Sequence, residues 1–335
     1  MVSPFSIEEI FPDEAAGSVR LPRRQTGNSP QGLAVTLIAD YTLRTRAWLP
    51  TAAIVALLGD FGVTIGAART AISRLARRGV LEGSRHGRHS SYRLTQPAAI
   101  DLSDGGTAIA ALAAHADTWD GSWTLIAFTL PKEKATQRSA LRTRLRWLGC
   151  APLYDGLWVS PHPLTAKAHA ELTAMAPGAT TAFRAHLLEL GADGTRNPID
   201  AWDVAAIAQQ YDTFIHRWRP LLPRIRAGRV TGAAAMRART GVMDTYRRFP
   251  ALDPMLPLEL MPPGWPRTHA REVFLTVYDG LAEPAQDHVR TVVAQVADGP
   301  HPHIRAHTIA EMSTGIGTVH VEGVHSTHDS ATGRR

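Results

Sequence analysis

The chain has 335 residues, of which 44% are hydrophobic, and a formal net charge of +6 at pH 7. This length allows two or three domains with buried cores. The one cysteine, Cys150, excludes an internal disulfide framework, and no apolar run is long enough to span a bilayer. The N-terminal sequence MVSPFSIEEIFPDE is acidic where a signal peptide is basic, so we expect a cytoplasmic protein without a membrane partner.

Three helices are predicted in the first part of the chain. Residues 1–28 show little periodicity and are expected to form a flexible tail. Amphipathic patterns then predict helices at 31–41 and 51–59, separated by a break at Trp48–Pro50. A third helix is predicted between an N-cap at Thr64 and a C-cap at Gly79.

The third predicted helix has two different faces when its residues are placed about 100° apart. The buried face is expected to contain Ile65, Ala68, Ile72, Leu75 and Ala76. The exposed face carries small residues first and guanidinium groups later, namely Gly66, Ala67, Thr70, Ser73, Arg74, Arg77 and Arg78. Arg69 projects near the edge of the apolar stripe, where it would bridge to a neighbouring helix or reach a phosphate from the side.

A basic hairpin follows this helix. Strands are predicted at 80–83 and 90–94, joined by a cationic loop over 84–89. Three helices followed by such a hairpin is the order of a winged helix-turn-helix, whose third helix enters the DNA major groove while the loop contacts the backbone. The predicted DNA-binding domain covers 29–97. Its expected contact residues are Thr64, Gly66, Ala67, Arg69, Thr70, Ser73, Arg74, Arg77, Arg78, Arg85, His86, Arg88 and His89.

Within this set the roles differ along the helix. Arg74 is placed to form a forked hydrogen bond with guanine, whereas Arg77 and Arg78 are better placed for phosphates. A solvated basic face without a ligand is the alternative. The charge distribution favours DNA, because residues 20–95 contain twelve arginines against three acidic residues, while the rest of the chain has a net negative charge.

The middle of the chain predicts an α+β domain over 118–192. Its elements are a strand at 122–130, a basic helix at 132–147, strands at 150–154 and 157–160 around Asp155-Gly156, a helix at 165–175 and a strand at 181–190. A strand-helix-strand-strand-helix-strand order is typical of a ferredoxin-like βαββαβ domain.

The remainder predicts a helical C-terminal domain over 198–299. Helices are expected at 202–218, 232–249 and 271–281, with a proline-rich connector at 250–266 that cannot be regular helix. Five residues of this region are expected to pair internally between helix and connector: Tyr246, Arg247, Arg248, Asp253 and Trp265. Residues 300–335 are predicted to form a second flexible tail. The predicted fold class is therefore α+β, with three domains.

Three separate stretches resemble one protein family. They are RTAISRLARRGVLE (69–82) with SYRLT (91–95), WDGSWTLIAF (119–128) with RLRWLGCAPLYDGLWVSP (144–161), and YRRFPALDPMLPLELMPPGWP (246–266). With these motifs the chain resembles the PaaX-like family of bacterial transcriptional regulators, whose founding type represses phenylacetic acid degradation genes. The resemblance implies a winged-helix domain, a central ferredoxin-like domain similar to that of CRISPR-adaptation nucleases, and a helical C-terminal domain.

The same resemblance implies a function and its partners. A family member of this kind is a homodimer that binds inverted-repeat operators and is released by a small effector, an aryl-CoA thioester such as phenylacetyl-CoA in the founding type. An activator has the same DNA chemistry and remains an alternative. The operator sequence does not follow from the resemblance, since Gly66 and Ala67 give the helix start an unusually plain surface.

An effector of this class requires cations for its phosphates and an aromatic or apolar slot for its acyl group. The central domain offers both types, in Arg138, Arg142 and Arg146 and in Trp123, Trp147 and Trp158. The alternative is that the tryptophans belong to the core and the arginines to a solvated face.

We expect no enzymatic activity, no cofactor and no metal. The strand at 122–130 ends without an acidic metal ligand and has Asp120 at its opposite end. His301, His303 and His307 have a loose zinc-like spacing but lack a cysteine partner. No nucleophile-elbow, P-loop or dinucleotide motif occurs. A metal-dependent phosphodiesterase in the central domain is the enzymatic alternative, which a metal-dependent turnover assay distinguishes.

Overall fold

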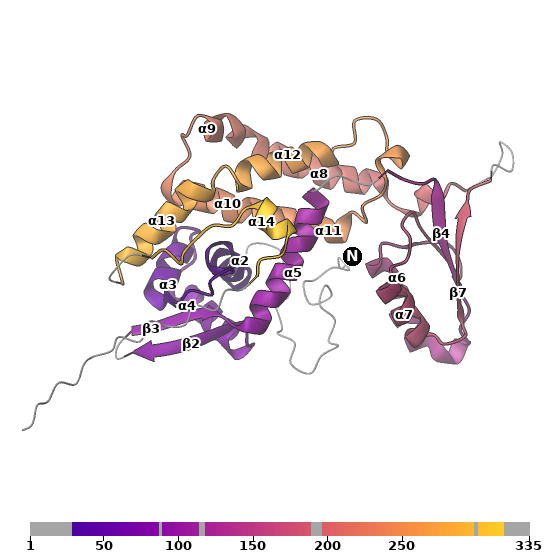
Figure 1. Cartoon of the computed structure of the whole chain (residues 1–335), viewed down its shortest axis with the longest axis horizontal. Helices are drawn as coiled ribbons and strands as arrows, with labels where there is room; N and C mark the ends of the chain where they lie inside the picture. Colours follow the sequence, from indigo (N-terminus) through magenta and orange to yellow (C-terminus); the bar gives the residue numbers. More distant parts are fainter. Residues whose placement is uncertain (1–28, 87–88, 114–117, 189–195, 298–300, 318–335) are drawn as a thin grey trace, which may run out of the picture. The chain divides into compact units, whose positions relative to one another are not determined.

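The computed structural model describes residues 29–86, 89–113, 118–188, 196–297 and 301–317 (Figure 1). The chain forms two compact units. Of the described residues, the first unit contains 29–106, 231–240 and those from 282 onward; the second contains 107–230 and 241–281. These limits differ from the predicted domains, because the C-terminal helices are shared between the two units.

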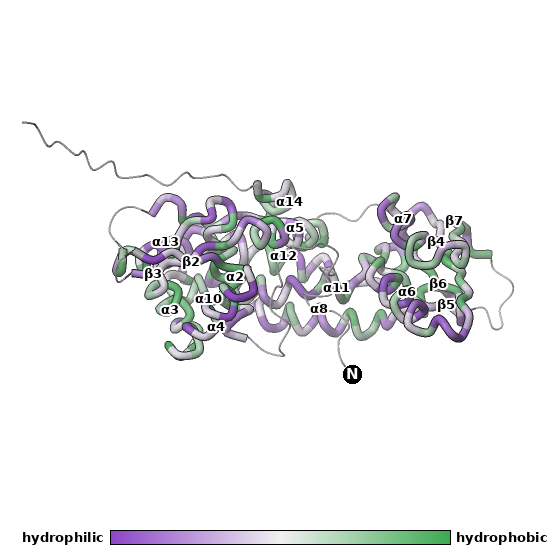
Figure 2. The backbone as a smooth tube through the Cα atoms, turned by 90° about the horizontal axis from the view of Figure 1, so that it is seen from below, coloured by the Kyte–Doolittle hydropathy of each residue, from purple (hydrophilic) through white to green (hydrophobic). Residues whose placement is uncertain are grey.

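The first unit is built on three short helices. They are α2 (Pro30–Thr42), α3 (Thr51–Gly59) and α4 (Ile65–Arg77). The side chain of Ser29 caps α2 by accepting a hydrogen bond from Gly32 N, and α3 has the predicted bounds. Ala53, Ile54, Leu57 and Leu58 of α3 are buried, and Figure 2 shows this helix mostly in the green of hydrophobic residues. Both α2 and α3 pack against α4.

A three-stranded antiparallel sheet follows these helices, in the order β1-β3-β2. The strands are β1 (Leu49–Pro50), β2 (Leu81–His86) and β3 (His89–Leu94). The predicted strands are thus both present and longer, and β1, which pairs Leu49 with Tyr92, replaces the predicted break. Helix α5 (Gln96–Ala113) comes next, where the sequence predicted no element.

The C-terminal part of the first unit corrects one prediction. Helix α13 (Ala282–Ala294) packs against α3, and α14 (Ile309–Ser313) begins with a capping box formed by Thr308 and Glu311. Residues 301–317 are therefore ordered rather than part of a flexible tail. Their backbone is held by distant residues: Arg305 N donates to Tyr41 O at 2.8 Å, and Ile316 N donates to Ser103 Oγ at 2.9 Å. The predicted tails at 1–28 and 318–335 lie outside the described residues.

The second unit contains a four-stranded antiparallel sheet in the order β5-β6-β4-β7. Its elements in chain order are β4 (Ser122–Phe128), the 3-10 turn η1 (Lys132–Lys134), α6 (Ala135–Trp147), β5 (Ala151–Tyr154), β6 (Leu157–Ser160), α7 (Ala166–Met175) and β7 (Thr180–His186). Figure 1 shows α6 and α7 side by side on one face of the sheet, where Ile126, Leu141 and Trp158 form a buried core. On the other face Trp123 and Val159 pack against Trp202 and Leu260.

Helices make up the rest of the second unit. They are η2 (Pro198–Ala201), α8 (Val204–Trp218), η3 (Arg219–Leu221), α9 (Leu222–Arg226), the last part of α10 (Gly232–Tyr246), α11 (Phe249–Leu252), η4 (Leu258–Leu260) and α12 (Arg267–Tyr278). The proline-rich connector thus contains only two short helical turns. Phe249, at the start of α11, stacks on Tyr211 of α8 with a centroid distance of 4.2 Å, and Tyr246 of α10 stacks on Phe274 of α12 at 3.8 Å.

The expected internal pairing of the connector takes a different form. Arg247 and Arg248 pair with Asp244, one helical turn earlier, and not with Asp253. Asp253 instead forms a buried ion pair with Arg267, a residue that was not among the five expected to pair. Spacing along the chain could not identify this pair, because the two residues meet only through the turn of the connector.

Candidate nucleic-acid interface

Helix α4 begins at the residue that the sequence predicted. Thr64 is the N-cap, and its hydroxyl accepts a hydrogen bond from Ala67 N. At the other end the C-cap is Arg78, and Gly79 follows it with a φ of +72°, a left-handed conformation that glycine adopts without steric cost. The helix is therefore bounded by local signals that the sequence carries.

The two faces of α4 agree with the helical period apart from three residues. Ala68, Ile72 and Leu75 are buried as predicted, but Ala71 is buried too, while Ala76 is only half-buried. Ile65 is 61% exposed because it occupies the first position of the helix, where no neighbouring element covers it. Arg69 is exposed and bridges to no helix that the structure describes, so α4 presents this cation to solvent as well.

The remaining predicted contact residues of α4 all lie at the surface. Ala67 is half-buried, and the others are exposed: Thr64, Gly66, Thr70, Ser73, Arg74, Arg77 and Arg78. Within the described part of the chain, the guanidinium groups of Arg69, Arg74, Arg77 and Arg78 have neither an ion-pair nor a hydrogen-bond partner. Four unpaired cations on one helix surface create a positive potential, which attracts polyanions.

The hairpin next to α4 carries the other predicted contacts. Strands β2 and β3 pair from Leu81↔Leu94 to His86↔His89, so the cationic tip of the hairpin is shorter than the predicted loop. Arg85 and His89 are exposed. His86 lies at the end of β2, while Arg88 falls outside the described residues.

Other arginines of the basic segment have structural partners instead. Arg46 is 7% exposed, and its guanidinium donates to Glu82 at 2.5 Å and to Leu94 O at 2.9 Å. Arg93 also pairs with Glu82, at 2.6 Å, and lies 4.4 Å above the ring of Trp48. Burial lowers the pKa of Arg46. The net charge of the segment therefore overstates the number of cations available to a ligand.

The turn between α3 and α4 is held by residues that the sequence analysis missed. His288 Nε2 of α13 lies 2.8 Å from Asp60 Oδ2, and Arg237 of α10 donates to Asp60 O at 3.2 Å. This turn sets the angle between α3 and α4 and so the direction in which the exposed face of α4 points. No local pattern marks these contacts, because the partners are far apart along the chain.

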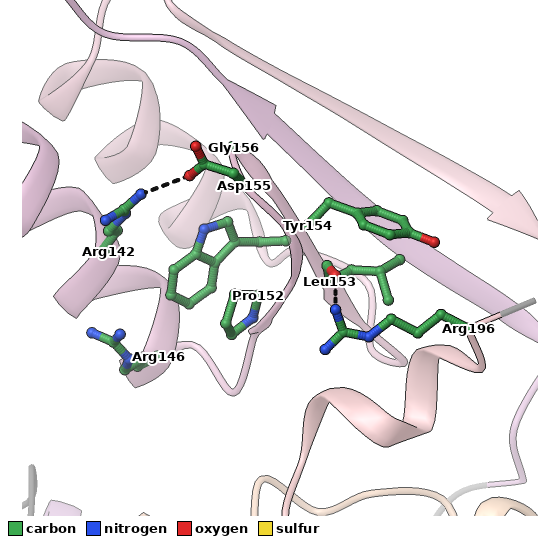
Figure 3. A pocket seen from close by; sticks show the side chains of 9 residues that line it. Arg142, Arg146, Pro152, Leu153, Tyr154, Asp155, Gly156 and Arg196 are labelled. Atoms are coloured by element: carbon green, nitrogen blue, oxygen red, sulfur yellow. Dashed lines mark hydrogen bonds and ion pairs between the residues drawn. The ribbon is translucent and has the colours of Figure 1, made fainter. Parts of the chain in front are cut away.

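The six predicted effector residues do not lie in one place. Arg142, Arg146 and Trp158 line one pocket of about 380 Å³, together with Tyr154, Asp155 and Arg196 (Figure 3). Arg142 pairs with Asp155 at 3.0 Å, Arg196 donates to Leu153 O at 2.6 Å, and Arg146 lies 5.4 Å from the centroid of the Trp158 ring. Sequence reasoning missed Arg196, which lies just beyond the predicted end of the central domain and some forty residues after Leu153.

The other three predicted effector residues do not line this pocket. Arg138 donates to the backbone oxygens of Leu130 and Pro131. Trp123 belongs to the opposite face of the sheet, where its ring lies 5.2 Å from that of Trp119 and 6.2 Å from that of Trp202. Trp147 is half-buried at the end of α6. We therefore restrict the candidate effector site to Arg142, Arg146 and Trp158.

No metal centre is found among the residues that the structure describes, where no three His, Cys, Asp or Glu side chains are grouped to hold an ion. His307 is buried, and burial together with the nearby Arg239 guanidinium lowers the pKa of His307 to about 3. Across the same residues, no helix is both long and apolar enough to cross a membrane.

Comparison with known proteins relates most of the chain to one family. Three family models match it: "PaaX-like protein" at residues 29–98, "PaaX protein central Cas2-like domain" at 116–196 and "PaaX-like protein C-terminal domain" at 202–291. The transcriptional repressor PaaX of Escherichia coli strain K12 is 30% identical over 249 residues, which cover 71% of this chain and 75% of that protein. A repressor is not an enzyme, in agreement with the expectation from the sequence.

One solved structure has a similar fold. The uncharacterized protein Rv0674 from Mycobacterium tuberculosis matches with a TM-score of 0.52 and 24% sequence identity. The match covers 76% of this chain and 96% of that one, so most of the described architecture occurs in both proteins.

Proposed function

Because the chain belongs to the PaaX-like family, we propose that it is a transcriptional repressor that binds operator DNA through a winged helix-turn-helix. Helices α2, α3 and α4, followed by the β2–β3 hairpin, have the order of such a domain. The observation that carries the proposal is the set of four unpaired arginines on α4, beside a hairpin with exposed Arg85 and His89. Binding to chromosomal DNA would place the protein in the cytoplasm.

In this proposal α4 enters the major groove. Its first turn offers the small residues Gly66 and Ala67, which allow the helix to approach the base edges closely. Arg74 reads guanine, and Arg77 and Arg78 contact phosphates. The hairpin, with Arg85, His86, Arg88 and His89, contacts the backbone beside the groove. The central domain has the ferredoxin-like fold, which the strand order β5-β6-β4-β7 supports.

The protein is proposed to act as a homodimer on an inverted repeat. A two-fold axis relates the two α4 helices, and the half-sites then lie about one helical turn, roughly 10 base pairs, apart. Two recognition helices double the number of base contacts, and the spacing between them becomes part of the specificity.

Mapping of bound DNA across the genome tests the proposal. We expect enrichment of promoter sites that contain an inverted repeat. We also expect transcription of the adjacent genes to rise after deletion of the gene for this protein. Transcription that falls after deletion would indicate an activator instead. A complete lack of enrichment would contradict DNA binding itself. The genes beside the bound sites would also indicate the pathway.

The proposed effector is an aryl-CoA thioester that binds at the pocket of Arg142, Arg146 and Trp158. Guanidinium groups supply charge-assisted hydrogen bonds to phosphates, and the ring of Tyr154, which is 55% exposed, supplies an apolar surface, while Trp158 is buried beneath the pocket. The repressor has two dimer geometries in this proposal, and only one has the half-site spacing of the operator. An effector that binds more tightly to the other geometry causes the repressor to release the operator.

The pocket makes a specific prediction for effector response. Substituting both Arg142→Ala and Arg146→Ala should leave operator affinity unchanged but raise the phenylacetyl-CoA concentration for half-release by about tenfold or more, because each lost charge-assisted hydrogen bond contributes about 1.5–3 kcal/mol. Fluorescence anisotropy of labelled operator, titrated with phenylacetyl-CoA, measures this concentration. Lys167→Ala, an exposed cation on α7, is the matched control. Equal release of both proteins would place the effector elsewhere.

A further inference from the structure

Ile65 is the most exposed large apolar residue that the structure describes in the first unit, at 61%. It is the first residue of α4, directly after the N-cap Thr64, whereas Ile72 and Leu75 of the same helix are buried. A single exposed aliphatic side chain needs no explanation by itself. The neighbours of Ile65 on α4 are what give its exposure a meaning.

Ile65 borders the face of α4 that carries the unpaired cations. At about 100° per residue, Ile65 lies within about 40° of Arg69, which is one turn further along the helix. Because helical side chains tilt toward the N-terminus of their helix, we expect Ile65 to project beyond the start of α4 into solvent. In a recognition helix, the residues at this end are those that contact base edges. Ile65 therefore lies where the duplex of the proposed function comes nearest to α4.

Gly66, the next residue, leaves room for a close partner at the first turn of α4. Its φ is not positive, so the backbone conformation does not require glycine. Apart from its chain neighbours and the turn to which it belongs, no atom among the described residues lies within 4 Å of the place that a Cβ of residue 66 would occupy. Glycine is also less favourable than alanine in a helix. Neither backbone nor packing explains glycine here, whereas the close approach of base edges does.

The chemistry of Ile65 limits what it can read. Its side chain has no hydrogen-bond donor or acceptor, so it cannot pair with the polar groups of the bases. The apolar group that base edges present in the major groove is the 5-methyl group of thymine. A contact between the two removes apolar surface of both from water, which is favourable. A T·A pair is therefore the base pair that Ile65 can distinguish.

We propose that Ile65 recognises the methyl group of a thymine and thereby selects a T·A pair under the first turn of α4. This inference rests on the proposed function and adds one base pair to the operator half-site. The guanine assigned to Arg74 is a separate position, because Arg74 follows Ile65 by nine residues, or about 13.5 Å along the helix axis. Apolar and polar recognition thus come from different turns of α4.

Removal of thymine methyl groups one at a time tests this contact. The probe is a duplex that the unsubstituted protein selects from a random-sequence pool, with each thymidine replaced in turn by deoxyuridine. Burial of one methyl group changes a binding constant about fourfold, so replacement at the contacted position should lower affinity about fourfold in one half-site and about fifteenfold in both. Ile65→Ala should bind the thymidine duplex more weakly by at least these factors, and replacement at that position should then have no further effect. Fluorescence anisotropy of the labelled duplexes measures these affinities.

Two further variants separate this contact from a structural role of the first turn. Ile100→Ala removes another exposed aliphatic side chain of the same unit, on α5, and should respond to deoxyuridine as the unsubstituted protein does. Gly66→Ala should unfold at the same temperature or a higher one, because alanine favours helix, yet it should bind the duplex at least about tenfold more weakly, because its methyl group occupies the space of the base edges.

The outcomes distinguish this inference from the proposed function. A methyl effect that persists unchanged in Ile65→Ala, or the lack of a methyl effect at every position in a protein that binds DNA, would overturn the thymine contact and leave the proposed function intact. Full affinity of Gly66→Ala would overturn it as well, since the first turn of α4 would then not lie against the bases. If the unsubstituted protein selects no duplex, the proposed function fails together with this inference.

Discussion

Substituting Arg74→Ala and Arg77→Ala together is expected to lower operator affinity by about a hundredfold or more. A forked contact from arginine to guanine contributes about 1–3 kcal/mol of discrimination, and a phosphate contact contributes to affinity through counterion release. The single Arg74→Ala variant should therefore relax specificity at one base pair. The single Arg77→Ala variant should weaken binding to all sequences and reduce the slope of log affinity against log salt by about 1. Mobility-shift titrations at several salt concentrations measure both effects.

The control for this experiment removes the same charge from another helix. Arg224 and Arg226 are exposed residues of α9, so the double variant Arg224→Ala/Arg226→Ala has the same net charge but an unchanged α4. It should bind the operator as the unsubstituted protein does. The fold should survive in both variants, because Arg74 and Arg77 are exposed and form no ion pair with any residue that the structure describes. Unaltered binding by the α4 variant would reject this face as the DNA contact.

Removing the carboxylate of Asp253 is expected to have the largest effect on stability. Asp253 is 1% exposed and forms two hydrogen bonds with the Arg267 guanidinium, at 2.6 and 2.9 Å. Its oxygens also accept from Tyr211 Oη at 2.6 Å and from Met255 N at 2.9 Å. Asp253→Ala leaves a buried, uncompensated guanidinium, which costs about 3–5 kcal/mol of unfolding free energy. It also releases Met255, which has a φ of +59°.

Chemical denaturation followed by circular dichroism measures this loss, and a second variant separates its causes. In Asp253→Leu/Arg267→Met both charges are absent, so most of the stability should return, as it does when a buried ion pair is replaced by apolar side chains of similar size. Asp212→Ala, an exposed carboxylate on α8, should change stability by less than about 0.5 kcal/mol. If Asp253→Ala unfolded at the same denaturant concentration as the unsubstituted protein, the ion pair would have no structural role.

The elements that the sequence predicted best are those with local signals at both ends. Helix α3 has its predicted bounds, α4 begins at its predicted N-cap, and β6 covers Leu157–Ser160 as expected. The last element of the central domain, β7, is a strand as predicted, although it ends at His186 rather than at 190. Caps, turn residues and the helical period act over a few positions, so a single sequence contains them.

Helix α5 and the segment 301–317 show where local signals fail. Gly105 and Gly106 lie inside α5, and glycine disfavours helix by about 1 kcal/mol, so tertiary packing overrides the local preference there. The segment 301–317 is polar enough to resemble a tail, yet Ile304 and His307 are buried in it. The residues that form hydrogen bonds with the backbone of this segment, such as Tyr41 and Arg239, come from much earlier in the chain.

The sequence by itself therefore determined the family, the order of the elements and the face of α4 that is rich in arginine. Only the tertiary structure decided which arginines are available for a ligand: Arg46 and Arg93 brace the hairpin through Glu82, whereas Arg74 and Arg77 remain exposed. It also joined Arg196 to Arg142 and Arg146 in one pocket and placed β5 and β7 at opposite edges of their sheet. The physical reason is that the neighbours in space decide whether a charge is paired, whether a strand lies at an edge and whether a pocket forms. These neighbours come from segments that are far apart along the chain, at separations that no sequence pattern marks.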